Sequence, residues 1–221
     1  MNPKWRCASC ALISIGALAG SSSLYAKPIA FAQGTTVMAE YGAGSMRELQ
    51  AFYAPRYFLS TGLGHTALDS DVDGRSRDIT YARLNYLVKR WNLEGAQANV
   101  FTWGGAGSAT TGEDSHGRFA WNAGAQLDYE TRRVYASLKS DYFDSSSFSH
   151  RIDTLQLGVA PYKHDYDTLA TWFVVQAREY TGEIHSGTEW AFLLRLFNRG
   201  AWIEAGPTTD GKVQAMFMFN F

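Results

Sequence analysis

Regular alternation of hydrophobic and polar residues is the feature that most constrains how this chain can fold. Near the C-terminus Val213, Phe217 and Phe219 would share one face of a strand, whereas Gln214 and Asn220 would share the other. The same alternation recurs in segments separated by clusters of Gly, Asp, Ser and Thr. A period of two is typical of β-strands, in which successive side chains point to opposite faces. The chain is therefore predicted to be all-β and antiparallel.

Ten segments have this alternation and form a single predicted domain over residues 48–221. They are 48–66, 79–90, 95–103, 118–130, 134–143, 153–162, 171–180, 189–197, 201–206 and 212–221. Ten strands is the expected number, and eight or twelve are also compatible because residues 35–44 alternate in part. Residues 27–47 are expected to form a lead-in or a plug ahead of the strands.

The first 26 residues are predicted to be a cleaved secretory signal. Lys4 and Arg6 precede an apolar stretch over residues 8–20, and small residues follow it. This order is typical of an export signal. Cleavage as late as residue 32 is compatible with the pattern Ala30-Phe31-Ala32. Both cysteines, Cys7 and Cys10, lie in this segment, so the exported chain would have neither disulfides nor thiol ligands.

A soluble sandwich or barrel and a membrane-spanning barrel both alternate in this way, so other features must separate them. Trp, Tyr and Phe recur near the ends of the predicted strands, as in the aromatic girdles of membrane barrels. The chain also ends in aromatic residues at every second position, Phe217, Phe219 and Phe221. This ending resembles the assembly signal of Gram-negative outer-membrane β-barrels. The sequence therefore favours a transmembrane antiparallel β-barrel.

The resemblance implies a location and a set of partners. The expected location is the outer membrane, where the barrel would contact lipid and lipopolysaccharide as a monomer. The barrel-assembly machinery would be a partner during biogenesis. Nucleic acid is not an expected partner, because the formal net charge of the 221 residues is only −1.

The polar faces of the predicted strands carry charges that would point into the lumen. Barrels of eight to ten strands have narrow interiors that side chains fill. Charges buried there must be paired, because an unpaired ion in a poorly hydrated interior is costly. We therefore expect a charge network that blocks wide passage, formed by Arg56, Arg83, Lys139, Arg178, Arg195, Asp128, Asp141, Glu189 and Glu204.

One predicted outer loop has the alternating carboxylates with which calcium loops begin. Asp69, Asp71 and Asp73 precede Gly74, but Thr80 stands where a calcium loop needs a bidentate Glu. Weak Ca²⁺ binding at this loop is the only metal or cofactor expectation, beside the simpler interpretation as a solvated acidic loop.

The sequence thus predicts a small barrel with a charged, largely filled lumen that serves envelope structure or narrow-pore transport. The alternatives are an outer-membrane hydrolase active at the rim, either a protease or a lipid-modifying enzyme, and metal or ligand binding at the outer loops. The chain has no Gly-x-Ser-x-Gly, His-Glu-x-x-His or phosphate-binding Gly loop, so the sequence gives no support to an enzyme.

Overall fold

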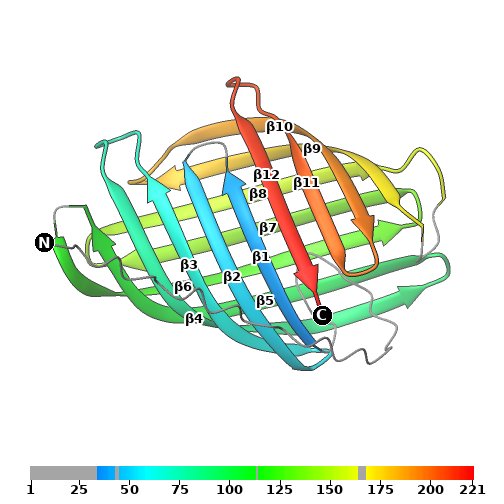
Figure 1. The fold of residues 1–221 in the computed structure, drawn as a ribbon, viewed down its shortest axis with the longest axis horizontal. Helices are drawn as coiled ribbons and strands as arrows, with labels where there is room; N and C mark the ends of the chain where they lie inside the picture. Colours follow the sequence, from blue (N-terminus) through cyan, green and yellow to red (C-terminus); the bar gives the residue numbers. More distant parts are fainter. Residues whose placement is uncertain (1–33, 43–44, 113, 164–167) are drawn as a thin grey trace, which may run out of the picture.

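The computed structural model describes residues 34–42, 45–112, 114–163 and 168–221, and the predicted signal segment lies outside them. Twelve antiparallel strands form one closed barrel in the order β1-β12-β11-β10-β9-β8-β7-β6-β5-β4-β3-β2 (Figure 1). The strands are β1 Gly34–Gly42, β2 Met46–Arg56, β3 Leu59–Asp69, β4 Ser76–Leu93, β5 Ala96–Thr111, β6 Asp114–Thr131, β7 Val134–Ser145, β8 Phe148–Val159, β9 Ala170–Gly182, β10 Gly187–Asn198, β11 Ala201–Pro207 and β12 Val213–Asn220. The described residues contain no helix long and apolar enough to cross a membrane.

Pairing of the first and last strands closes the barrel. β1 and β12 are antiparallel, with Thr36 opposite Asn220 and Ala39 opposite Phe217. Beyond the end of β12, Thr35 and Phe221 exchange two backbone hydrogen bonds of 2.7 and 2.9 Å. Closure satisfies the edge that an open sheet would leave unpaired.

The structure confirms the antiparallel barrel and has twelve strands rather than the expected ten. One difference is the predicted strand at 48–66, which is divided into β2 and β3 by a turn at Tyr57 and Phe58. The ladder register shifts between Tyr53 and Arg56, next to Pro55, which has no N–H to donate to a ladder. Hydrophobic alternation continues through this turn, which is why the pattern alone did not reveal it.

The other difference lies in residues 27–47, which were expected to be a lead-in or plug. Residues 34–42 within this segment form β1, a strand of the barrel wall paired with both β2 and β12. Its alternation is weak, because Thr35 and Thr36 are both polar although Thr36 is buried and Thr35 is only partly so. The remainder of the predicted lead-in before residue 34 lies outside the described residues.

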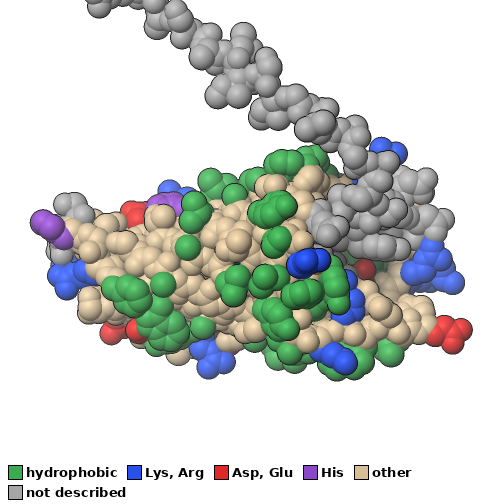
Figure 2. Space-filling model, turned by 90° about the horizontal axis from the view of Figure 1, so that it is seen from below, with side chains coloured by type: hydrophobic (Ala, Val, Ile, Leu, Met, Phe, Trp, Pro, Cys, Tyr) green, Lys and Arg blue, Asp and Glu red, His purple; other side chains and the backbone are tan. Residues whose placement is uncertain are grey.

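The apolar side chains face outwards, and the polar side chains face into the barrel. On β10, Leu194 is 42% exposed on the outer wall, whereas the neighbouring inward residues Arg195 and Leu193 are buried. Ala191, on the same face as Arg195, is fully buried. The predicted phase of this strand is therefore confirmed. Figure 2 shows hydrophobic side chains spread along one side of the wall, with visible histidine side chains at one end.

The two ends of the barrel differ in their connections. We call one end the base: β1 begins and β12 ends there, and short turns at 57–58, 94–95, 132–133 and 199–200 join its strands. We call the other end the rim, where the β3–β4 loop (70–75) and the β9–β10 loop (183–186) lie. The rim also has short connections at 112–113 and 146–147, and the longest connection, 160–169, lies at the base.

Candidate functional site

Three charge clusters bridge strands across the middle of the lumen. The first joins Arg195 on β10 to Glu204 on β11, with Arg195 Nε 2.5 Å from Glu204 Oε2. Gln156 on β8 accepts a 2.8 Å hydrogen bond from Arg195 and donates one of 3.1 Å to Glu204. The Arg195 guanidinium lies between the rings of Tyr135 and Trp202, at 4.4 and 4.5 Å from their centroids. Stacking on two faces and hydrogen bonding at the edge hold this cation in one orientation.

The second cluster is centred on Asp141 of β7. Lys139 Nζ lies 2.9 Å from one oxygen of this carboxylate, and Arg83 Nη2 of β4 lies 3.7 Å from the other. Trp103 on β5 donates its indole N–H to the same oxygen at 2.7 Å. Gly124 makes room for this indole, because a Cβ at residue 124 would lie 2.4 Å from the Trp103 ring. Two cations and an indole thus share one buried carboxylate.

The third cluster joins strands that are far apart around the ring. Arg178 on β9 donates to Glu40 on β1 at 2.6 Å. Glu189 on β10 is buried in the ladder position next to Arg178. Among the described residues, Nε and Nη1 of Arg178 and Nε of Arg83 have no hydrogen-bond partner. These buried N–H groups therefore remain donors that the three clusters do not use.

The clusters surround a cavity of about 100 Å³ in the middle of the lumen. All four cations of the clusters line it, together with Glu40, Glu204 and amide side chains such as those of Gln126 and Gln214. A space of this size and polarity can hold a few water molecules. A filled interior in a twelve-stranded barrel depends on long side chains, because the interior widens as strands are added.

Hydrophobic side chains pack together inside the lumen on the rim side of this cavity. They form one buried cluster, contributed by strands around the ring and by the β9–β10 loop: Met46, Leu68, Ile79, Tyr81, Ala109, Ala120, Phe143, Phe148, Ile152, Tyr180 and Ile184. Gly64 belongs to this packing, since a Cβ there would lie 2.3 Å from the Tyr81 ring. An apolar layer contributed by β2 to β9 and the β9–β10 loop thus lies between the polar cavity and the rim.

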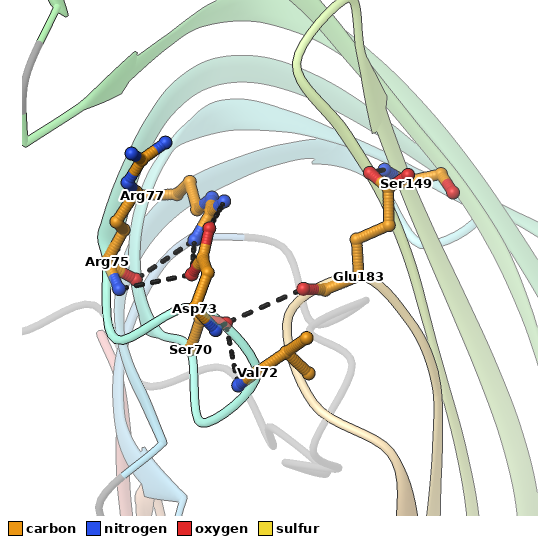
Figure 3. Close-up of polar contacts among 7 residues, drawn as sticks. All are labelled: Ser70, Val72, Asp73, Arg75, Arg77, Ser149 and Glu183. Carbon is orange, nitrogen blue, oxygen red and sulfur yellow. Dashed lines mark hydrogen bonds and ion pairs between the residues drawn. The ribbon is translucent and has the colours of Figure 1, made fainter.

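Above the apolar layer, the loops 70–75 and 183–186 meet across the mouth of the barrel, and we call this contact the clasp (Figure 3). The backbone N–H of Asp71 donates to the carbonyl of Ile184 at 3.2 Å. The hydroxyl of Ser70 lies 3.5 Å from the carbonyl oxygen of Glu183. His185 Nδ1 and an Asp71 carboxylate oxygen are also in hydrogen-bond contact. The clasp therefore joins two loops that lie on opposite sides of the ring.

An ion pair anchors the clasp to the wall. Arg77, buried near the start of β4, donates to both oxygens of Asp73 at 2.7 and 2.6 Å. Hydrogen bonds from the Arg77 guanidinium hold the pKa of the Asp73 carboxyl well below its usual range, and the backbone N–H of Arg75 adds to this effect. The carboxylate therefore stays ionised at all but strongly acidic pH.

The three predicted calcium ligands have separate partners. Asp69 faces the outer wall, where it accepts hydrogen bonds from Arg47 and Ser76, whereas Asp71 contacts His185 and Asp73 binds Arg77. Among the described residues, no group of three or more His, Cys, Asp or Glu side chains is arranged to hold a metal ion. The structure therefore does not bring Asp69, Asp71 and Asp73 together around one point.

Most of the predicted lumen charges are buried inside the barrel. Arg83, Lys139, Arg178, Arg195, Asp141 and Glu204 form the three clusters, and Glu189 lies beside the third. Asp128 is buried farther toward the base and accepts a hydrogen bond from Asn99 at 2.5 Å. Arg56 is the exception. It lies exposed at the end of β2, after the bulge beside Pro55, outside the network.

Two lumen carboxylates were absent from the prediction. Glu40 lies on β1, which was assigned to the lead-in, so its face was not considered. Glu48 lies on β2 and accepts hydrogen bonds from Tyr81 at 2.6 Å and Thr66 at 2.8 Å. Glu48 precedes Leu49, which faces outwards, so the alternation of faces could have assigned Glu48 to the lumen.

The terminal aromatic residues lie along the seam that closes the barrel. Phe217 and Phe219 are exposed on the outer face of β12, the strand that pairs with β1. Phe221 follows that strand, with its ring 5.9 Å from that of Phe219. The predicted assembly signal thus coincides with the C-terminal strand, whose pairing with β1 closes the ring.

Comparison with known proteins found no match: no family model, no curated protein and no solved structure matches the chain.

Proposed function

We propose that the protein is a Gram-negative outer-membrane β-barrel whose filled lumen makes it an envelope scaffold rather than an open pore. The observation that carries this proposal is the inverted distribution of side chains, with an apolar outer wall around buried charges. Soluble monomers rarely expose large contiguous apolar surfaces, and an outward apolar band around a polar interior is typical of membrane barrels.

The dimensions of the wall support the same proposal. The strands β7, β8 and β10 each have 12 residues and β9 has 13. A tilted strand of about 9 to 11 residues crosses the hydrocarbon core of a bilayer. Aromatic side chains such as Tyr129 and Trp190 are exposed on the outer wall near strand ends, where an interfacial girdle would lie.

The contents of the lumen distinguish a scaffold from a pore. A path along the axis would have to pass the three charge clusters, the apolar layer and the clasp. The cavity of about 100 Å³ favours, as a second candidate, a narrow route for water or a small ion that opens when these layers rearrange.

Single-channel recording in planar bilayers tests the choice between scaffold and pore. The refolded protein should insert, shift in heat-modifiable gel migration and produce no stable open channel. A steady conductance in the nanosiemens range would contradict the scaffold. Recovery of the folded protein as a soluble species without detergent would contradict the membrane barrel itself.

A hydrolase active at the rim is a candidate from a different class. The contact between Asp71 and His185 is the observation that favours it, because a carboxylate can orient an imidazole as a general base. Cleavage assays with peptides and with lipid A test this candidate, and an activity that His185→Ala abolishes without loss of folding would establish it in place of the scaffold.

A further inference from the structure

An apolar groove runs across the outer wall over five consecutive strands, from β7 to β11. Its volume is about 690 Å³, and we call it the wall groove. The residues that shape it include Ala136, Leu157, Phe173, Phe192, Leu194 and Ala205. The outer surface of a closed barrel is convex, so a hollow of this volume on that surface requires a local cause.

Differences in side-chain size produce the hollow. Ala136 on β7 and Ala205 on β11 are small outward residues, whereas Phe173, Phe192 and Leu194 project between them. The groove is therefore shaped by the contrast between these small and large outward side chains.

The length of the groove fits one hydrocarbon chain. Four steps between adjacent strands, at about 4.8 Å each, give about 19 Å from β7 to β11. Half of a hydrocarbon core about 30 Å thick is about 15 Å, the depth that one acyl chain spans. The groove is thus long enough to hold an acyl chain along most of its length.

An arginine directly precedes Val134, the residue of β7 that lines the groove nearest the base. Val134 and Val159 are ladder partners and both line the groove. Directly next to them, exposed Arg133 donates from Nε to the carbonyl of Ala160 at 3.2 Å and from Nη2 to that of Pro161 at 3.3 Å. These two bonds hold the guanidinium where β7 begins and β8 ends, and Lys163 is exposed on the same connection.

We propose that the wall groove binds one anionic glycerophospholipid, with an acyl chain in the groove and the phosphate at Arg133. This inference rests on the proposed membrane location. An apolar trough that ends at a cation complements a molecule with a hydrocarbon chain and an anionic head. Arginine suits this role because its guanidinium can donate to phosphate while it also donates to the backbone.

Native mass spectrometry of the protein released from vesicles tests the proposal. The vesicles contain equal amounts of phosphatidylglycerol and phosphatidylcholine, and the readout is the number and identity of the lipids retained. The protein should retain one phosphatidylglycerol in preference to phosphatidylcholine. Arg133→Gln should reduce this headgroup preference by about fivefold, the typical contribution of one basic residue near an anionic surface. Ala136→Phe with Ala205→Phe should fill the groove and abolish retention of either lipid.

Matched changes on β2, far around the ring, provide the control. Ala51 is exposed on the outer wall of β2 and Arg56 is exposed at its base end. Ala51→Phe and Arg56→Gln should leave retention unchanged. Equal retention of both lipids, or equal loss in the β2 and groove variants, would overturn the proposal. A dimer retained in place of lipid would assign the groove to a second copy of the chain.

Insertion is measured in the same samples by heat-modifiable migration and protection from protease. Failure to insert would refute the membrane location and this inference with it. Normal insertion without a retained phosphatidylglycerol would refute the lipid site alone.

Discussion

The charge clusters of the lumen and the clasp at the rim use the same kinds of ion pair in different surroundings. Arg195 and Glu204 have side chains only 2% and 3% exposed, whereas the Asp71 side chain is 56% exposed. A buried ion that loses its partner cannot recover its hydration, but an exposed one can. Removal of one partner should therefore lower the free energy of unfolding more in the lumen than in the clasp, although both regions contain ion pairs.

The largest effect is expected from Arg195→Ala, which leaves Glu204 buried without its cation. Loss of one partner of a buried pair costs about 3 to 5 kcal/mol, and less where water can enter. The midpoint of urea unfolding in detergent should fall, and bilayer conductance should rise if the space left by the side chain opens a path.

The control for this change is Arg151→Ala. Arg151 binds Asp153 at 2.9 Å on the exposed wall near the rim. This change should alter the free energy of unfolding by less than about 1 kcal/mol. Equal effects of the two substitutions would refute the distinction between lumen and rim.

The next largest effect is expected from Leu194→Arg, on the outer wall beside Arg195. An arginine facing the lipid near the middle of a bilayer destabilises a barrel by about 2 to 4 kcal/mol. The free energy of unfolding in vesicles should fall by this amount, whereas in Leu194→Ala it should change less. Normal stability of Leu194→Arg in vesicles would mean that the wall does not face lipid.

These two adjacent positions show what the sequence could predict. Alternation assigned Leu194 to the outer face and Arg195 to the inner face, because a strand has only two faces. It could not identify Glu40 as the partner of Arg178, because a period of two does not reveal which strands face each other across the lumen. That information depends on the number of strands. The prediction had ten, because it left β1 out of the wall and treated β2 and β3 as one strand.

The contacts of the clasp could not be predicted from sequence patterns, for a different reason. Loops have no periodicity, so Asp71 and Asp73 could be compared only with a calcium-loop motif. Their partners His185 and Arg77 come from a loop on the opposite side of the ring and from the following strand. Only the closed barrel brings the two loops together.

A smaller effect is expected from Asp71→Asn in the clasp. Exposed ion pairs contribute about 0.2 to 1 kcal/mol, and the asparagine could still hydrogen bond to His185. Amide hydrogen exchange should become faster in residues 70–75 and 183–186, whereas the midpoint of global unfolding should change little. A loss of stability as large as that of Arg195→Ala would show that the clasp, and not the lumen, holds the barrel together.

The smallest effect is expected from mild acidification. The pKa of Asp73 is lowered in the folded protein, so its bond to Arg77 stabilises the clasp fully above the unfolded pKa near 4. This stabilisation is lost only as the pH falls through the lower, folded value. In a His185→Gln background, which removes the imidazole that contacts Asp71, hydrogen exchange of residues 70–75, corrected for the intrinsic effect of pH, should therefore stay constant from pH 7 to pH 5. In Asp73→Asn it should be faster throughout this range. A loosening of the loop between pH 7 and pH 5 in the His185→Gln background would show that Asp73 is not held by Arg77.

Spin-label accessibility along β10 tests most directly whether an apolar wall surrounds a closed polar lumen in a bilayer. Single cysteines would replace residues 190–195 in a chain in which Cys7 and Cys10 are changed to serine, and each label would be exposed in vesicles to oxygen and to a water-soluble nickel complex. Labels at Trp190, Phe192 and Leu194 should be accessible to oxygen and protected from nickel, and labels at the alternate positions should be poorly accessible to both. High nickel accessibility at 190, 192 and 194 would contradict the membrane-facing wall, and high nickel accessibility at 191, 193 and 195 would contradict the closed lumen.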